Sequence, residues 1–204
     1  HQENVSVSSG DKLYTYGTKY NDTIYGRKEK DNIFGYNGND TLYGNDGDDI
    51  LNGGNDNDIL IGGVGNDELK GDSGNDTYVY NLGDGFDTIT DTGGNDKIKF
   101  GEGINQNDLS FKTEGQNLKI LINNNETAGI QISSQLQGGS KVVETIEFHD
   151  GSTLDITNAD QLIQAMNSFG AETSSAMETL SDAVENVSDM YSLADNSDLT
   201  GKAA

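Results

Sequence analysis

The chain contains no cysteine, no proline and no tryptophan, and it carries little positive charge. Only 12 lysines and arginines oppose 35 acidic residues among the 204 residues, a formal net charge of −23. The lack of cysteine excludes disulfides and thiolate metal sites, and the lack of proline excludes slow prolyl isomerisation during folding. The acidity makes nucleic acid and anionic membranes poor partners on electrostatic grounds.

Long hydrophobic runs are absent as well. No stretch approaches the ~18 consecutive apolar residues that a membrane span needs, and no basic, apolar secretory leader stands at the N-terminus. The first residue is histidine and not methionine, which indicates a fragment of a longer protein. Any export signal is therefore expected elsewhere than at this N-terminus.

A nine-residue unit repeats seven times in register from Gly17 to Val79. Position one is glycine, and positions two and four are often glycine, as in the copies 35–43 and 62–70. Position six is aspartate in every copy: Asp22, Asp31, Asp40, Asp49, Asp58, Asp67 and Asp76. Position eight is apolar in every copy: Ile24, Ile33, Leu42, Leu51, Leu60, Leu69 and Tyr78. A fixed period of this kind dictates a stacked architecture.

Each unit supplies too few buried side chains to offset its own chain entropy, so the units must stack. We expect a short strand at positions seven to nine and a turn over the six preceding residues. Two units then complete one coil of a parallel β-helix. Turns of repeats n and n+2 lie one strand spacing apart, about 4.8 Å.

That stacking brings aspartates together, Asp40 over Asp58 and Asp49 over Asp67. Carboxylates at this distance repel one another unless a cation lies between them. Calcium accepts six to eight oxygens, backbone carbonyls included, in tolerant geometry, whereas magnesium demands a tighter octahedron and should substitute badly. Strong acidity with 32% hydrophobic residues would otherwise favour disorder. The periodic aspartates instead predict a domain that folds once several Ca²⁺ ions neutralise it.

The repeats resemble the glycine- and aspartate-rich nonapeptide of RTX proteins, Gly-Gly-x-Gly-x-Asp-x-U-x, where U is a large apolar residue. The resemblance covers 17–99 and implies a parallel β-roll that binds calcium. The segment 78–91 looks like the exit from such rolls, and 162–169 is similar to a helix that commonly follows them. In that family an uncleaved C-terminal segment directs export, which implies the type I secretion ABC transporter apparatus as a partner and an extracellular destination.

The repeats are not equal as candidate metal sites. Repeat one has Tyr20 at position four, and repeat two has Glu29 there, amid Arg27, Lys28 and Lys30. Lysine ammonium groups can neutralise such a turn, so we predict weak or empty sites and a cap at this end. We expect the strongest sites at Asp40, Asp49, Asp58, Asp67 and Asp76, with Asp87 closing the last one opposite Asp67. The other candidate metal-site residues are Asp22, Asp31, Gly35, Asn37, Gly38, Gly44, Asp46, Gly47, Gly53, Gly54, Asp56, Gly62, Gly63, Gly65, Gly71 and Gly74.

The sequence predicts a mainly β chain in four parts. These are an N-terminal flank (1–16), the β-roll (17–100), a capping region of antiparallel β hairpins packed on the end of the array (101–156), and a helical tail with the export signal (157–204). The tail stripe from Met177 to Tyr191 recurs at helical spacing. A marginal helix that is partly disordered alone and a signal that the transporter recognises explain it equally well, and the two are compatible. Its acidity argues against anionic membranes.

No cluster predicts an enzyme. There is no His-Glu-x-x-His zinc motif and no Gly-x-Ser-x-Gly elbow, and Gly71–Gly74 is better explained as the start of repeat seven than as a protease motif. Two functions stay open. One is a calcium-dependent folding and secretion module of a secreted bacterial protein. The other is a repeat module of a toxin or adhesin that binds a host-cell receptor or a glycan directly.

Overall fold

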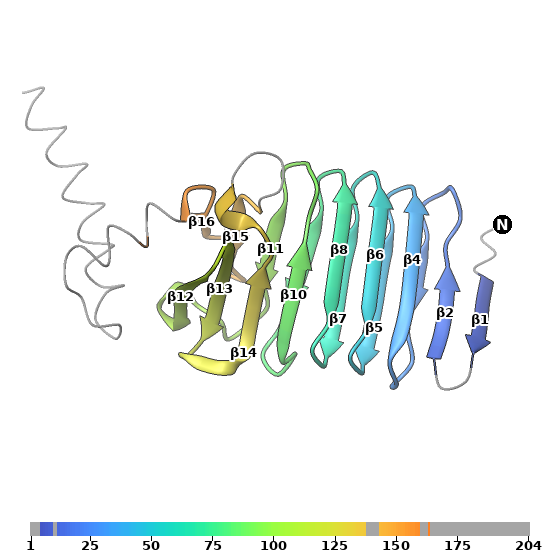
Figure 1. The fold of residues 1–204 in the computed structure, drawn as a ribbon, viewed down its shortest axis with the longest axis horizontal. Helices are drawn as coiled ribbons and strands as arrows, with labels where there is room; N and C mark the ends of the chain where they lie inside the picture. Colours follow the sequence, from blue (N-terminus) through green and yellow to red (C-terminus); the bar gives the residue numbers. More distant parts are fainter. Residues whose placement is uncertain (1–4, 10–11, 138–142, 160–162, 164–204) are drawn as a thin grey trace, which may run out of the picture. The chain divides into compact units, whose positions relative to one another are not determined.

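Two sheets form a β-solenoid of stacked coils, and successive strands of the repeats alternate between them (Figure 1). The computed structural model describes residues 5–9, 12–137, 143–159 and 163. The first sheet contains, in spatial order, β1 (Val5–Ser9), β2 (Lys12–Tyr16), β4 (Asp31–Asn37), β6 (Ile50–Asn55), β8 (Glu68–Ser73), β10 (Phe86–Thr90), β14 (Asn125–Ile132), β13 (Asn117–Ile122) and β12 (Leu109–Glu114). The second contains β16 (Thr153–Asp155), β15 (Thr145–Glu147), β11 (Lys97–Phe100), β9 (Thr77–Tyr80), β7 (Ile59–Val64), β5 (Thr41–Asp46) and β3 (Thr23–Tyr25). Two short 3₁₀ helices, η1 (Gln106–Asp108) and η2 (Gln135–Gln137), lie in the connections.

The register confirms that two nonapeptides make one coil. Strand β5 pairs in parallel with β7, placing Leu42 beside Leu60, and β7 pairs with β9, placing Leu60 beside Tyr78. In the other sheet Ile33 pairs with Leu51 in the same way. Every unit is thus directly above the unit two repeats away.

The core of the roll consists of the position-eight side chains, as predicted. They point between the two sheets because side chains alternate along a strand. None is more than 2% exposed: Ile24, Ile33, Leu42, Leu51, Leu60, Leu69 and Tyr78. This single apolar residue per unit fixes the register, since a slip of one residue would expose the whole stack.

The strands are longer than positions seven to nine. Strand β5 continues through positions one to three of the next repeat, where Asn45 pairs with Gly63 and Asp46 with Val64. The pairing between strands therefore extends into positions one to three, which we predicted to belong to the turn. In contrast, β2 ends at Tyr16 and β3 at Tyr25, so the chain leaves the ladder earlier in repeats one and two.

The capping region contains the predicted antiparallel pairs, β12 with β13, β13 with β14, and β15 with β16. It does not simply pack on the end of the array, however. Strands β14 and β15 pair in parallel with β10 and β11, so both sheets of the roll continue into this region. Ile130, Ile132 and Ile146, all at most 1% exposed, extend the apolar stacks.

The N-terminal flank also joins the roll. Strand β2 pairs in parallel with β4, and β1 folds back on β2 as an antiparallel edge. The predicted helical tail lies outside the described residues except for 157–159 and 163. Within the described part of the chain, no helix has the length and apolar character needed to cross a membrane.

Candidate metal centre

The position-six aspartates stack in two columns, one along each row of turns. Each backbone N–H donates to the Oδ1 atom of the aspartate one coil further on, at 2.7 to 3.0 Å. The first column consists of Asp22, Asp40, Asp58, Asp76 and Asp96, and the second of Asp31, Asp49, Asp67 and Asp87. The predicted stacking of Asp40 over Asp58 and of Asp49 over Asp67 is thus present.

These carboxylates are buried, and seven of the nine are incompletely satisfied. All nine are at most 2% exposed. An oxygen without any hydrogen-bond partner remains on Asp22 (Oδ1) and, as Oδ2, on Asp40, Asp49, Asp58, Asp67, Asp76 and Asp96. A buried charge without a partner is costly, so each of these atoms needs a proton or a cation.

The turns of repeats three to seven share a backbone conformation that suits this role. Positions two and four both have positive φ in all five, as in Tyr36 (80°) with Gly38 (105°) and Asp72 (71°) with Gly74 (138°). Non-glycine residues adopt this region rarely and at a cost. Position-one glycine makes room for the carboxylate, because a Cβ on Gly53 would lie 2.2 Å from Asp58 Oδ2.

Burial raises the pKa of these carboxyl groups. The pKa of Asp58 rises to about 8 and those of Asp67 and Asp76 to about 7. The pKa values of Asp40 and Asp49 rise to about 6. Loss of hydration is the largest cause, the backbone N–H donated to each carboxylate partly opposes it, and neighbouring aspartates add to it.

A pH dependence of the ion-free chain follows from these raised pKa values. A carboxyl group whose pKa is higher in the folded than in the unfolded state adds to the free energy of unfolding while it is protonated. For these aspartates the contribution is complete below about pH 4, and it is lost as the pH rises through about 6 to 8. In buffer freed of calcium beforehand we therefore expect more β signal in far-UV circular dichroism at pH 5 than at pH 8. With calcium present the trend should reverse or flatten, because protons compete for the ligand oxygens. A calcium-free spectrum that does not change between these pH values would contradict the raised pKa values of the buried aspartates.

The donor set fits calcium. The unpartnered atoms are all carboxylate oxygens, which a hard cation prefers, and they recur at one-coil intervals beside turn backbone that can add carbonyl oxygens. Three of the other predicted metal-site side chains, those of Asn37, Asp46 and Asp56, are exposed. Their role as calcium ligands stays a prediction, and the charge of Asp56 acts to raise the pKa values of Asp40 and Asp58. Asn37 accepts a hydrogen bond from Asn55 at 2.7 Å, and Asp56 accepts one from the Gly38 N–H at 3.1 Å.

One further cluster was missed by sequence reasoning. Asp76, Asp91 and Asp96 are buried, and one carboxylate oxygen of each lies within 4.8 Å of the others. The Tyr78 hydroxyl donates to Asp91 Oδ2 and accepts from the Gly71 N–H. The sequence feature that could have revealed this cluster is the spacing between Asp76 and Asp96, which is 20 residues and not 18. This spacing marks a two-residue insertion in the last coil.

We expect Asp91→Asn to weaken one calcium site selectively. The substitution keeps the shape of the side chain but removes one of three clustered charges, and calcium affinity follows ligand charge, here by about an order of magnitude. Calorimetric calcium titration should show one weakened site with the others unchanged. Asp150→Asn, at an exposed turn aspartate, is the control. Equal effects of the two variants would argue against a site at Asp91.

Repeats one and two differ from the others in how their aspartates are satisfied. Asp22 Oδ2 accepts from the backbone N–H and the hydroxyl of Thr18, at 2.6 and 2.9 Å. Both oxygens of Asp31 accept hydrogen bonds from Arg27. Neither turn contains a residue with positive φ. These two turns therefore lack the geometry that repeats three to seven share.

Comparison with known families accounts for the buried columns. The model of the RTX calcium-binding nonapeptide repeat matches this chain in four copies, at residues 16–51, 43–78, 52–86 and 79–106. The chain belongs to the RTX family. RTX nonapeptide repeats bind calcium, and the aspartates with unpartnered oxygens all lie within the matched residues. The strands that extend the RTX roll match a second model, the haemolysin-type calcium binding protein related domain, at residues 117–158.

A bacterial protein is similar to part of this chain. The iron-regulated protein FrpA of Neisseria meningitidis serogroup C is 35% identical over 95 residues. The match covers 43% of this chain but only 8% of that protein. The chain is thus an RTX calcium-binding repeat module of a bacterial protein, and it spans a small part of the length of this relative.

Proposed function

We propose that this chain is a calcium-dependent folding and secretion module, which leaves the cell unfolded and folds around several Ca²⁺ ions outside it. The observation that carries the proposal is the set of unpartnered, buried carboxylate oxygens in the two columns. Without cations the folded state must hold these charges away from water and close to one another, which disfavours it. RTX repeats occur in proteins exported by type I secretion, and they are typically structural and non-enzymatic.

The proposal explains the unusual charge of the chain. An ion-free chain with a net charge of −23 repels itself and stays expanded, a state suited to passage through a narrow export channel. Calcium is scarce in the cytosol and abundant outside, so the same sequence is stable on only one side of the membrane. The C-terminal tail (157–204) would carry the signal that the transporter apparatus recognises.

Deletion of 157–204 tests the two halves of the proposal together. Calcium-dependent folding of the truncated chain should persist, because both aspartate columns lie within repeats and coils that end before this segment. Export by a type I system should be lost. Unimpaired export would remove the secretion signal from the tail, and loss of calcium-dependent folding would show that the roll needs it.

A receptor- or glycan-binding module is the second candidate function. Stacked aromatic side chains on the outside of the roll favour it: the rings of Tyr25 and Tyr43 stack with centroids 4.6 Å apart, and Tyr25 is 62% exposed. Binding of the calcium-folded chain to cells or to a glycan panel, abolished by Tyr25→Ala, would support this function. Binding that persists in Tyr25→Ala would assign it to another surface.

A further inference from the structure

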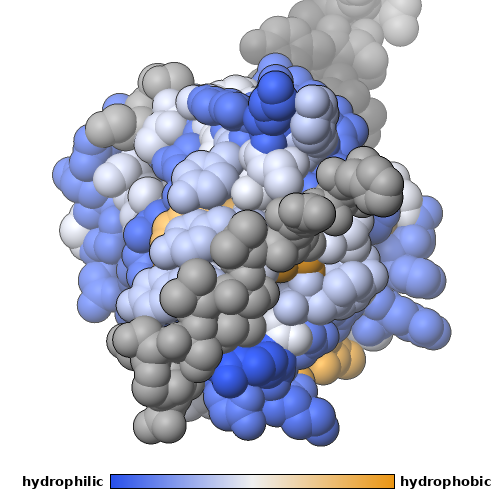
Figure 2. All heavy atoms as spheres, turned by 90° about the vertical axis from the view of Figure 1, so that its right-hand side faces the viewer, coloured by the Kyte–Doolittle hydropathy of each residue, from blue (hydrophilic) through white to orange (hydrophobic). Residues whose placement is uncertain are grey.

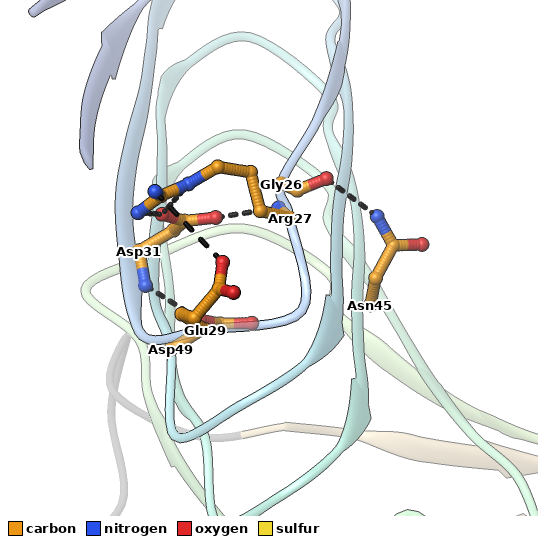
Figure 3. A network of polar contacts seen from close by, with 6 residues as sticks. All are labelled: Gly26, Arg27, Glu29, Asp31, Asn45 and Asp49. Carbon is orange, nitrogen blue, oxygen red and sulfur yellow. Dashed lines mark hydrogen bonds and ion pairs between the residues drawn. The ribbon is translucent and has the colours of Figure 1, made fainter. Parts of the chain in front are cut away.

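The turn of repeat two contains its own cation. The Arg27 guanidinium contacts Asp31 Oδ1 through Nε at 3.0 Å and Nη2 at 2.7 Å, and the Arg27 backbone N–H donates to Asp31 Oδ2 at 2.5 Å (Figure 3). The Asp31 side chain is fully buried, whereas that of Arg27 is 38% exposed. Both oxygens of Asp31 are therefore satisfied without a metal ion, whereas in Asp49, directly above it, Oδ1 accepts from the Asp31 N–H and Oδ2 has no partner.

The backbone of this turn also departs from the calcium-binding form. Positions two and four have positive φ in every turn from repeat three to repeat seven. In repeat two these positions are Arg27 and Glu29, and neither has a positive φ. The strand before this turn ends at Tyr25 and does not extend through positions one to three. The turn thus has neither the free oxygen nor the conformation that the other turns share.

Charges on the two stacked turns are complementary. Repeat two adds Lys28 and Lys30 to Arg27, and the turn above contributes Asp46 and Asp49. Lys28 Nζ lies 3.8 Å from Asp46 Oδ2, and the charge of Lys30 acts to lower the pKa of Asp49. The Asp31 N–H donates to Asp49 Oδ1 at 2.7 Å, and Asn45 Nδ2 donates to the Gly26 carbonyl at 2.8 Å, so the two turns are tied directly together (Figure 3).

We infer that Arg27, through its backbone N–H on Asp31 Oδ2 and its guanidinium on Oδ1, replaces the calcium ion in the turn of repeat two, which makes this turn a calcium-independent first step of its column. The inference rests on calcium binding by the later turns. Arginine stays charged at every accessible pH, and its planar fork suits a carboxylate better than lysine does. The sequence had indicated neutralisation by lysine, but the two lysines lie outside and the arginine makes the buried contact.

The position of Arg27 gives this turn a role. It lies near the N-terminal end of the roll, where the visible surface is mainly hydrophilic (Figure 2). Because Arg27 already compensates the charge of Asp31, this turn can be ordered without calcium. Asp49 of the next coil is then held in place by the hydrogen bond from the Asp31 N–H. The column can then add ions in one direction, toward Asp67 and Asp87.

Calcium stoichiometry of the whole chain, measured by isothermal titration calorimetry, tests the inference. Asp31→Asn should bind as many ions as the wild type, whereas the matched variant Asp49→Asn should bind fewer. Loss of an ion in Asp31→Asn would overturn the inference. A wild type that binds no calcium would instead overturn the proposed function, so the two failures are distinguishable.

Asp31→Asn leaves Arg27 without its charged partner, which can prevent folding. Two further variants keep the test decisive in that case. Arg27→Met/Asp31→Asn removes both charges together and should fold in calcium with unchanged stoichiometry; a lost ion would count against the inference. Arg27→Gly/Glu29→Gly places glycine at positions two and four and should bind one additional ion. An unchanged count in this variant would show that Arg27 does not stand in for calcium.

Discussion

In excess EGTA at neutral pH, the chain is expected to lose most of its β signal in far-UV circular dichroism, and millimolar calcium is expected to restore it. The reason is the burial of the aspartate columns. Asp40, Asp58 and Asp76 follow one another along one column, each at most 1% exposed and each with an unpartnered oxygen. Without a cation these carboxylates must either be protonated or repel one another at about one strand spacing.

The free energy that calcium binding contributes to folding is large enough to switch the chain between the unfolded and the folded state. With a Kd of about 100 μM and external calcium of about 1 mM, each site adds roughly 1.4 kcal/mol of stability. Five such sites add roughly 7 kcal/mol, which is comparable to the whole stability of a typical domain, about 5–15 kcal/mol. At cytosolic calcium the same term nearly vanishes.

Magnesium at the same concentration is the control for this experiment. It requires a smaller, nearly ideal octahedron and releases its water reluctantly, so it should restore little of the β signal. Equal β signals in EGTA and in calcium would contradict calcium-dependent folding. Equal recovery in magnesium would mean that the ions act as general counter-charge and not as site-bound ligands.

The sequence period was enough to predict the roll, because one apolar residue and one aspartate per unit repeat without interruption. Leu42 and Leu60 pair as expected, and Asp40 donates its backbone N–H to Asp58. Such features depend only on the period and on side-chain alternation. The burial of position eight and the stacking of position six therefore needed no tertiary information.

The remaining features depend on contacts that no period encodes. Asp91 lies outside the nonapeptide frame, and it accepts hydrogen bonds from the Tyr78 hydroxyl and the Gly93 N–H in its place beside Asp76 and Asp96. The parallel pairing of β14 and β15 with the roll is likewise set by long-range packing. The sequence indicated that the turn of repeat two is basic. It did not indicate that Arg27, and not one of the lysines, contacts Asp31, because that depends on the conformation of the turn.

Asp58→Ala is expected to raise the calcium concentration at the folding midpoint several-fold, and Asp22→Ala to change it little. Asp58 lies in the middle of its column: it accepts the N–H of Asp40 and donates its own to Asp76. Its loss should impair the sites on both sides, a cost of roughly 3 kcal/mol at the affinities assumed above. Asp22 is at the end of the column, and Thr18 already satisfies one of its oxygens.

Calcium titrations of both variants, followed by circular dichroism, measure the difference. Asp58→Asn separates the charge from the hydrogen bond, because it keeps an acceptor for the Asp40 N–H while removing the negative charge. If calcium ligation dominates, Asp58→Asn should shift the midpoint nearly as far as Asp58→Ala. A small shift in Asp58→Asn would assign the effect to the hydrogen-bond ladder. Equal shifts in Asp58→Ala and Asp22→Ala would mean that all turns of the column bind calcium alike, against the difference in turn geometry between repeats one and three.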